Sequence, residues 1–356
     1  MKQERLKRVI SHMEGAGLKQ LVISDPDSIY YLTGIGYNPG ERLLALYIND
    51  QGDAHLFNNH MFPQQPQEGL TIHFYDDTDD YMGMMAEVVS GGDLGVDKFW
   101  NAKFLLPLLE KRADLRPRLG SGPVDQARVL KDSEEIALMR RASAINDDTM
   151  AEVIQRLGEG LTERQMVGVV GDAHLRRGAD VAYEQLICYG RGCCESHHCS
   201  GSATIQPGDP AIFDIFAPVN HYWCDMTRTV FYRSASDEQR RVYDVVRAAN
   251  EAGIAAIQPG VPLSEVDGVT RKVISDAGYG DYFTHRTGHN IGLALHEPPD
   301  CSSTSPVLIQ PGMCFSVEPG VYLPGKWGVR VEDLVAVTET GVEVLNHFTK
   351  DLLIIG

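Results

Sequence analysis

Two carboxylates interrupt strand-like runs that are otherwise apolar, and this feature constrains the fold more than any other. Asp214 lies within residues 211–216, and Asp225 lies within residues 223–227. An unpaired carboxylate inside a sheet costs several kcal/mol, so it needs a cation or must be protonated. The segment 217–221 is turn-like, so a hairpin is expected to bring the two aspartates side by side. The sequence therefore predicts an antiparallel hairpin that holds a divalent metal.

A second pair of acids repeats this arrangement near the C-terminus. Glu318 ends the apolar run 313–317, and Glu332 follows residues 329–331. The intervening segment 319–325 is rich in proline and glycine, which is typical of a turn. A second acid-bearing hairpin is therefore expected.

The residues between the two hairpins, 287–298, supply the imidazoles of His289 and His296. Four carboxylates and one histidine make an oxygen-dominated site, which suits Mn, Co, Mg or Zn better than a metal that prefers thiolates. One ion does not need four carboxylates, whereas two ions ~3.5–4 Å apart would use all of them. The ligand set therefore predicts a site for two metal ions.

The composition limits what else the chain could bind. At 356 residues it has room for roughly two domains of ~100–200 residues. A formal net charge of -17 disfavours nucleic acid and anionic lipid as partners, because both require a positive field. No apolar run approaches the ~20 residues that cross a bilayer, and residues 1–10 lack the apolar stretch of a secretory signal. We expect a cytoplasmic protein whose seven cysteines are reduced thiols.

Turn residues divide the chain into two parts. The Gly-Ser-Gly-Pro run at 120–123 interrupts the pattern and predicts a boundary between an α/β domain at 1–125 and an α+β domain at 126–356. In the smaller domain we expect a helix around Leu6 to Met13 that Gly15 ends, and a turn at 25–27.

Capping boxes mark helix starts in the larger domain, where an acceptor is followed three residues later by Glu or Gln. The three pairs are Asp132 with Glu135, Thr162 with Gln165, and Ser236 with Gln239. A fourth helix is expected over 264–277. The expected strands are 20–24, 43–48, 210–216, 227–232, 313–317 and 329–337.

Five phrases around the candidate ligands carry a resemblance to a known family. They are Asp225-Met-Thr-Arg-Thr, Gly288-His289-x-Ile-Gly, His296-Glu297-Pro298, Val317-Glu318-Pro319-Gly320 and Val329-Arg-Val-Glu332-Asp333. In this order, over about residues 130–350, the chain resembles the pita-bread metallopeptidases, which include methionine aminopeptidase, aminopeptidase P and prolidase. Tyr30-Tyr31-Leu32-Thr33-Gly34 is similar to the creatinase-type N-terminal domain that accompanies the last two.

The resemblance implies a pita-bread C-terminal domain, a creatinase-like N-terminal domain and a homodimer. It also implies an exopeptidase that hydrolyses the bond before proline with a hydroxide bridging two metal ions, manganese first, with cobalt or zinc as alternatives. Prolidase, which cuts Xaa-Pro dipeptides, is our first choice because of the length of the chain. An Xaa-Pro aminopeptidase acting on tripeptides and longer peptides is the second. A pita-bread module that binds peptides without cutting them is the alternative from another class, and it predicts missing ligands.

The resemblance also assigns the metal ligands, position by position. Asp214 is implied on one metal, and His289 and Glu318 on the other. Asp225 and Glu332 are implied to bridge both. Glu318 is in addition the expected general base for the bridging water.

Four further residues receive roles in the same way. His296 matches the histidine that faces the scissile carbonyl, and His197 matches the one that contacts the peptide before the cut. Tyr222 and Arg330 are expected to contact substrate and to orient Asp225 and Glu332. The alternatives are an exposed hairpin aromatic for Tyr222, and for Arg330 an ordinary ion pair with one of the nearby acids.

The sequence of segment 190–199 departs from the family's usual pattern. The register from Asp214 favours His197, with His198 as the alternative. Three cysteines stand beside these histidines, but their spacing lacks the paired C-x2-C pattern of structural zinc.

Asp300 is the departure that affects the choice of substrate. Relatives that are strict dipeptidases tend to carry an arginine there, which can bind the terminal carboxylate of the substrate. Candidates to replace it are Arg286, Lys326, Arg330 and Arg42 from a partner subunit. If none serves, longer Xaa-Pro peptides are favoured.

Overall fold

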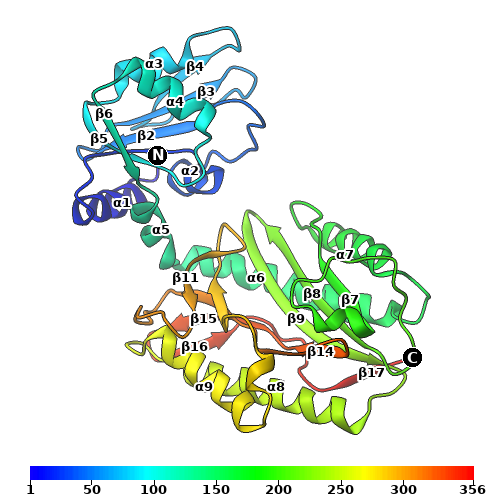
Figure 1. Cartoon of the computed structure of the whole chain (residues 1–356). Coiled ribbons are helices and arrows are strands. Elements are labelled where there is room, and N and C mark those ends of the chain that lie inside the picture. The colour runs from blue at the N-terminus through cyan, green and yellow to red at the C-terminus, as the bar shows by residue number, and fades with distance from the viewer. The chain divides into compact units, whose positions relative to one another are not determined.

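The computed structural model of the protein describes residues 1–356, and the chain forms two compact units, Met1–Arg128 and Val129–Gly356 (Figure 1). In the first unit a six-stranded mixed sheet has the order β4-β3-β2-β1-β5-β6. Its elements are α1 (Gln3–Gly15), β1 (Gln20–Ile23), α2 (Pro26–Thr33), β2 (Ala45–Asn49), β3 (Ala54–Asn59), β4 (Thr71–Tyr75), α3 (Tyr81–Val88), β5 (Gly92–Val96), α4 (Ala102–Lys111), β6 (Leu115–Leu119) and α5 (Gly122–Val129), whose last residue begins the second unit.

The start of α2 corrects one prediction about the first unit. Residues 25–27, expected as a turn, open a helix instead. The Asp25 side chain accepts hydrogen bonds from the backbone N–H groups of Asp27 and Ser28, and Pro26 occupies the first helical position. A turn and a helix start therefore share the same residue types here.

The second unit contains two antiparallel sheets and a separate hairpin. The sheets have the orders β17-β9-β8-β7 and β11-β10-β12-β15-β16, and the hairpin is β13-β14. The elements are α6 (Ser133–Val153), η1 (Ile154–Arg156), α7 (Glu163–Arg177), β7 (Leu186–Tyr189), η2 (Gly190–Cys194), β8 (Pro210–Val219), β9 (Tyr222–Tyr232), α8 (Asp237–Ala255), α9 (Leu263–Asp276), η3 (Gly280–Tyr282), β10 (Gly288–Asn290), β11 (Glu297–Cys301), β12 (Cys314–Val317), β13 (Gly320–Leu323), β14 (Trp327–Arg330), β15 (Asp333–Thr338), β16 (Gly341–Val344) and β17 (Leu353–Ile355). Helices and antiparallel sheets interleave, so the α+β prediction is confirmed.

The three predicted capping boxes are all present, at the starts of α6, α7 and α8. In each, the cap side chain accepts from the backbone three residues on, and the Glu or Gln side chain accepts from the cap backbone. The predicted fourth helix is α9. No helix combines the length and the apolar character needed to cross a membrane.

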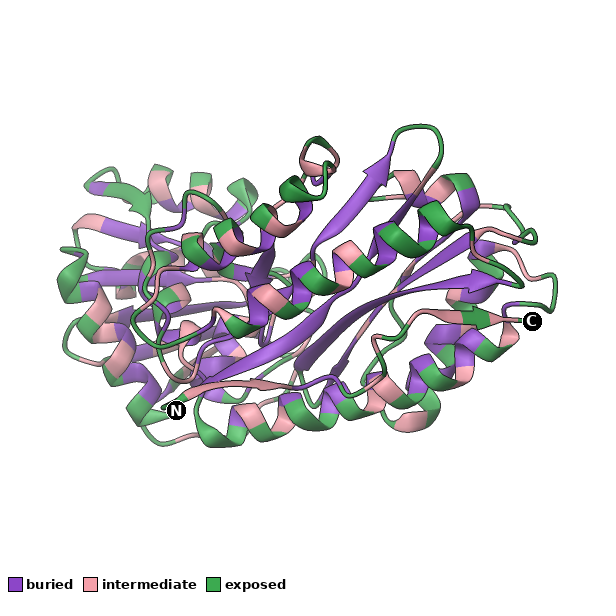
Figure 2. Cartoon of the chain, turned by 90° about the horizontal axis from the view of Figure 1, so that it is seen from below, coloured by how far each residue is buried: buried purple, intermediate pink, exposed green.

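The strands β8 and β9 form the long central hairpin of the unit, and Figure 2 shows both as almost entirely buried. Their turn is tighter than predicted. Only Asn220 and His221 lie outside the strands, and both have positive φ values, of 50° and 69°. This backbone is typical of a two-residue hairpin turn.

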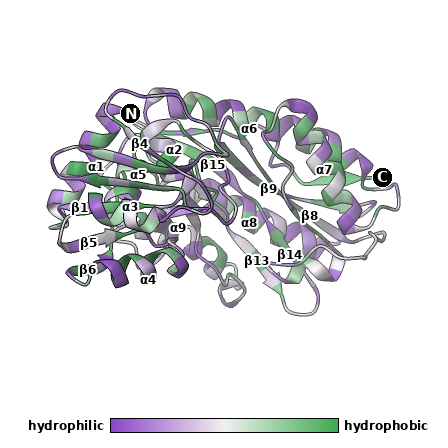
Figure 3. Ribbon diagram, turned by 90° about the horizontal axis from the view of Figure 1, so that it is seen from above, coloured by the Kyte–Doolittle hydropathy of each residue, from purple (hydrophilic) through white to green (hydrophobic).

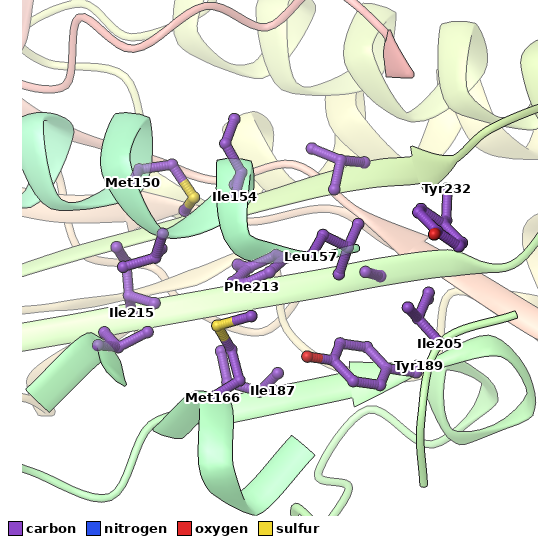
Figure 4. Packing of buried hydrophobic residues seen from close by; sticks show 14 of the residues in the cluster. Met150, Ile154, Leu157, Met166, Ile187, Tyr189, Ile205, Phe213, Ile215 and Tyr232 are labelled. Atoms are coloured by element: carbon purple, nitrogen blue, oxygen red, sulfur yellow. The ribbon is translucent and has the colours of Figure 1, made fainter. Parts of the chain in front are cut away.

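The helices α6 and α7 cover the outer face of the β7-β8-β9 sheet. Their hydrophobic residues lie on the side that faces the strands, and the helices alternate hydrophobic and hydrophilic residues along their length (Figure 3). In the core, Met150 of α6, Ile154 of η1 and Met166 of α7 pack against Phe213 and Ile215 of β8 (Figure 4). This packing fixes β8 and therefore the position of Asp214 between two core residues.

The run 329–337, predicted as one strand, is two strands. β14 pairs with β13, whereas β15 pairs with β12 of the five-stranded sheet. The chain changes partner at Val331 and Glu332, so the predicted continuous strand is wrong at the position of the candidate ligand. An acid at a break between strands can turn its side chain into a site without disturbing a hydrogen-bonded ladder.

Candidate active site

Asp214 and Asp225 lie on the same face of the β8-β9 hairpin. Asp214 is opposite Thr227, and Asp225 is opposite Phe216. The two aspartates are therefore diagonal neighbours rather than a directly opposed pair, and the alternation of side chains along a strand points both to one side.

Glu318 and Glu332 stand where the chain leaves and rejoins the five-stranded sheet. Glu318 follows β12, and Glu332 precedes β15, whose first residue Asp333 pairs with Val317. The backbone N–H of Glu332 donates to the carbonyl of Thr227 at 3.1 Å, which ties this glutamate to β9. The second acid pair is thereby brought to the strand that carries Asp225.

His289 on β10 lies between the acids. Its Nε2 is 3.6 Å from Asp225 Oδ2 and 3.5 Å from Glu318 Oε1, while its Nδ1 is 3.1 Å from the carbonyl oxygen of Asn290. A proton on Nδ1 would satisfy that carbonyl and leave the Nε2 lone pair directed at the carboxylates. Ligand atoms of Asp225, His289 and Glu332 all lie within 4.8 Å of one another.

The charges of this cluster are only partly compensated, because Arg330 forms an ion pair with Asp214 alone among these acids. Burial raises the pKa of Asp225 well above its usual range, and Glu332, Asp214 and Glu318 raise it further. Burial likewise raises the pKa of Glu332 well above its ordinary value, and that of Glu318 to about 7. Burial lowers the pKa of His289 to about 3, so its imidazole is neutral. Neutral histidine beside close carboxylates is the ionisation pattern of a site that lacks only a cation.

The residues present fit a metal. Asp225 is 4% exposed, and its Oδ1 has no hydrogen-bond partner. A buried carboxylate oxygen without a partner is costly unless an ion occupies its vacant lone pairs. Oxygen donors with one imidazole match divalent Mn, Co or Zn, and the ligand atoms of Asp225, His289 and Glu332 lie close enough together that these residues could hold one ion.

Arg330 connects the cluster to neighbours that the sequence did not indicate. Its Nη2 donates to Asp214 Oδ2 at 2.6 Å, its Nε donates to Thr227 Oγ1 at 3.0 Å, and its Nη1 donates to Tyr322 Oη at 2.9 Å. The Thr227 hydroxyl in turn donates to Glu332 at 2.7 Å. Arg330 therefore holds the candidate ligand Asp214 directly. It also orients Glu332, as predicted, but only through the hydroxyl of Thr227.

His285 and Tyr322 complete this network, and sequence reasoning missed both. His285 Nε2 is 2.8 Å from Tyr322 Oη, and burial lowers the pKa of His285 to about 3. Burial also raises the pKa of Tyr322 to about 12. Tyr322 lies in the segment 319–325, which was predicted as a turn, so nothing in the sequence indicated a buried hydroxyl that needs a partner.

His296 lies beside His289 of the acid cluster. Its ring lies edge-on to His289 with centroids 4.2 Å apart, and burial and then Arg286 lower its pKa. The next residue, Glu297, forms an ion pair with Lys131 at 3.0 Å in which both side chains are buried. That pair fixes the backbone on one side of His296.

One cavity of about 770 Å³ contains the site. The predicted ligands and histidines line it together: Asp214, Asp225, His289, Glu318, Glu332, His197 and His296, with Arg330. His198, Cys199, His285 and Arg286 also line it. All seven cysteines are free thiols, as the sequence predicts.

The structure places Tyr222 outside this cavity. Its hydroxyl donates to Glu135 Oε1 at 2.8 Å, and Glu135 belongs to the capping box of α6. Tyr222 is also three residues from Asp225 on one strand, so the two side chains point to opposite faces. The predicted contact with substrate is therefore wrong, and Tyr222 instead fastens β9 to α6.

Comparison with known proteins identifies the class of enzyme to which this site belongs. The model of metallopeptidase family M24 matches residues 137–339, and that of the creatinase/prolidase N-terminal domain matches residues 5–130. The chain belongs to metallopeptidase family M24, as its resemblance implied.

Relatives cover the chain over its whole length. An uncharacterized peptidase of Staphylococcus aureus (strain MSSA476) is 32% identical over 97% of this chain and 99% of its own length. The structure of a dipeptidase from Pyrococcus horikoshii OT3 matches with a TM-score of 0.94 and 30% identity over 99% of this chain and 100% of that one. An Xaa-Pro dipeptidase from Bacillus anthracis matches with a TM-score of 0.92 and 26% identity over 100% of both chains. The pita-bread fold and the creatinase-type N-terminal domain are thereby confirmed, and the protein is a metallopeptidase.

Proposed function

We propose that this metallopeptidase is a prolidase, which hydrolyses the Xaa-Pro bond of dipeptides with two divalent ions, manganese first. Asp214, Asp225, His289, Glu318 and Glu332 would hold the ions. The observation that carries the proposal is the buried Asp225 oxygen that lacks a partner within a cluster of acids and one neutral histidine. The similarity to an Xaa-Pro dipeptidase supports the choice of substrate.

The proposal assigns each side chain a step. Ions bound here supply a water of lowered pKa and polarise the scissile carbonyl. Glu318 accepts the proton of the attacking water on a carboxylate oxygen and returns it to the leaving proline nitrogen. His296 donates a hydrogen bond to the oxyanion, and His197 contacts the residue before the cut. The complete set of ligands favours this reading over a module that binds without cutting.

Arg286 is the best candidate for the substrate's terminal carboxylate. It lines the cavity and is close enough to lower the pKa of His296. Arg330 uses its N–H groups on Asp214 and other neighbours, and Lys326 lies outside the cavity, with its Nζ 3.8 Å from Glu238.

Arg42 and a homodimer complete the hypothesis. Arg42 forms an ion pair with Asp77 within the first unit at 2.8 Å, so it is already engaged there. A homodimer, which the family resemblance implies, belongs to the proposal, as does a proline-containing peptide as substrate.

Asp300 favours a second candidate function, an Xaa-Pro aminopeptidase. Its Oδ1 lies 3.2 Å from Arg286 Nη1, so it partly neutralises the one cavity arginine available to a terminal carboxylate. A longer peptide carries no carboxylate at that position and would not meet this competition.

Side-by-side hydrolysis of Ala-Pro and Ala-Pro-Ala tests the proposal. Protein stripped with a chelator and reloaded with Mn is expected to cut Ala-Pro and to leave Ala-Ala intact, because proline lacks the N–H and has a fixed φ. Preference for Ala-Pro-Ala would replace the prolidase with the aminopeptidase. Failure to cut either peptide despite full metal loading would reject both.

Substitutions at Arg286 and Asp300 are expected to have opposite effects on KM. Arg286→Gln should raise KM for Ala-Pro by about 10- to 100-fold, because a hydrogen bond to a charged group contributes about 1.5–3 kcal/mol. Asp300→Asn should lower KM, because it removes the competing carboxylate. The C-terminal amide of Ala-Pro is the control substrate. Equal effects of Arg286→Gln on the acid and the amide would show that Arg286 does not bind the carboxylate.

A further inference from the structure

A buried acid, Glu163, holds the loop that carries His197. Glu163 begins α7 and is 1% exposed. Its Oε1 accepts from the backbone N–H of Tyr189 at 2.8 Å. Its Oε2 accepts from the backbone N–H of Gly201 at 2.7 Å and lies 3.0 Å from His198 Nε2. One carboxylate thus joins the end of β7 to both the ring and the backbone of the 195–201 loop.

His198 is held on both sides of its ring. Besides Glu163 at Nε2, its Nδ1 lies 3.4 Å from Glu195 Oε2. Burial disfavours the imidazolium, but the carboxylates of Glu163 and Glu195 together outweigh this and raise the pKa of His198. Gly192 leaves the space for the pair, because a Cβ there would lie 3.0 Å from His198 Nε2 and 3.2 Å from Glu163 Oε1.

A second anchor lies on the other side of His197. The carbonyl oxygen of Ser196 accepts from Arg330 Nη1 at 3.1 Å, and Arg330 also holds Asp214. His197 itself is exposed in the cavity, and its ring makes no hydrogen bond. The position of this ring therefore depends on its two fixed neighbours, Ser196 toward the metal cluster and His198 toward Glu163.

We propose that Glu163 and His198 are positioning residues, whose ion pair holds the 195–201 loop so that His197 faces the substrate. The role of His197 in this inference rests on the proposed function, whereas the ordering of the loop does not. A loop held by one buried carboxylate avoids the entropic cost of ordering it during each binding event. Small displacements of a substrate-contacting group are expensive, because about 1 Å can cost about 100-fold in rate.

A double-mutant cycle separates positioning from plain structural support. Glu163→Gln keeps the size of the side chain but turns one acceptor oxygen into an amide NH2. It is expected to lower kcat/KM for Ala-Pro by about 10- to 100-fold. In a His197→Ala background the same change should cost less than about twofold, because the group being positioned is gone. Full additivity of the two substitutions would overturn the positioning role.

Substitutions of His198 test the pair from the other side. His198→Gln can still donate to Glu163 from its amide, whereas His198→Phe cannot. The glutamine variant should therefore retain at least about tenfold more kcat/KM than the phenylalanine variant. Equal activity of the two variants would contradict the inference.

Hydrogen exchange measures how well the backbone of the 195–201 loop is ordered, and it needs no substrate. In Glu163→Gln, the amides of residues 195–201 are expected to exchange at least about tenfold faster than in the wild type, because one uncharged amide oxygen then replaces the carboxylate that serves Tyr189, Gly201 and His198. Glu152→Gln is the matched control: Glu152 lies on α6 and forms ion pairs with Arg176 and Arg177 at the other end of α7 from Glu163. Unchanged exchange in Glu163→Gln would overturn the clamp even if the enzyme proves inactive on Ala-Pro, an outcome that by itself rejects only the proposed function.

Discussion

Glu318→Gln is expected to lower kcat for Ala-Pro by about 100- to 10,000-fold, the range that general acid-base groups contribute. The variant keeps the shape of the side chain and the ability to accept the hydrogen bond of Ser316, which is 3.3 Å away. It loses the carboxylate that would take the proton of the attacking water. Without a cation, burial raises the pKa of Glu318 to about 7, and ions held beside it would lower that pKa and keep the carboxylate ionised, as a base requires.

Metal content must be measured together with the rate, because Glu318 is both a proposed base and a proposed ligand. Inactive protein with full metal content would assign the loss to the missing base. Inactive protein that has lost metal would assign it to the ligand role. Glu251→Gln, an exposed acid on α8, is the control and should match the wild type. A Glu318→Gln enzyme with a rate near that of the wild type would remove Glu318 from the mechanism.

The cluster of acids could be predicted from the sequence because each acid conflicts with its surroundings. Asp214 and Asp225 stand in strands that bury their neighbours, so local pattern and residue type disagree, and such disagreements mark functional sites. The capping boxes could be predicted for a related reason, because a cap and its partner are only three residues apart. In both cases the information is local.

The network around Arg330 could not be predicted, because its contacts join residues far apart in the chain. Thr227, Tyr322 and Ser196 are ordinary residues for a strand, a hairpin and a loop, and nothing in their sequence neighbourhood shows which partner each will meet. Glu163 was hidden in the same way, since as the first residue of a helix it is a common residue in a common place. Only the fold reveals that it is buried under the His197 loop.

Tyr222 shows the opposite error, in which nearness in sequence was given too much weight. Its hydroxyl was expected beside Asp225, yet strand alternation directs the side chains at positions 222 and 225 to opposite faces. Alternation does not relate Arg330 to Glu332, because β14 ends at Arg330 and Glu332 lies in the break before β15. Whether two residues of a strand are an even or an odd number of positions apart therefore predicts contact between their side chains better than their distance along the chain.

Removing the metal is expected to make the stability of the protein fall as the pH rises. In the folded protein without a cation, the pKa values of Asp225 and Glu332 lie well above their ordinary range, and that of Glu318 is about 7. In the unfolded chain these groups titrate near about 4. The folded state therefore binds more protons between these values, and the stability that the protonated acids contribute is lost as the pH rises from about 4 through 7 and above.

Thermal unfolding from pH 5 to 8.5 measures this dependence. Chelated protein should melt at a lower temperature at pH 8 than at pH 5.5, and Mn should reverse the loss at pH 8. At a free metal concentration 1,000 times Kd, binding adds about 4 kcal/mol, which corresponds to a rise in Tm of about 10 °C for a unit of this size. The holoprotein should show a much flatter profile over the same range.

General acidity of the protein could also lower stability at high pH, since its net charge is -17. A paired substitution separates the two causes. Asp225→Asn with Glu332→Gln should flatten the profile of the chelated protein, because two of the repelling buried charges are removed. Asp244→Asn, an exposed acid of the same unit, changes the net charge but should keep the slope. Two outcomes would contradict the prediction: the chelated wild type gains stability as the pH rises, or Mn fails to raise Tm at pH 8. Either outcome would show that the buried acids do not form a metal site, and the proposed metal centre would have to be abandoned.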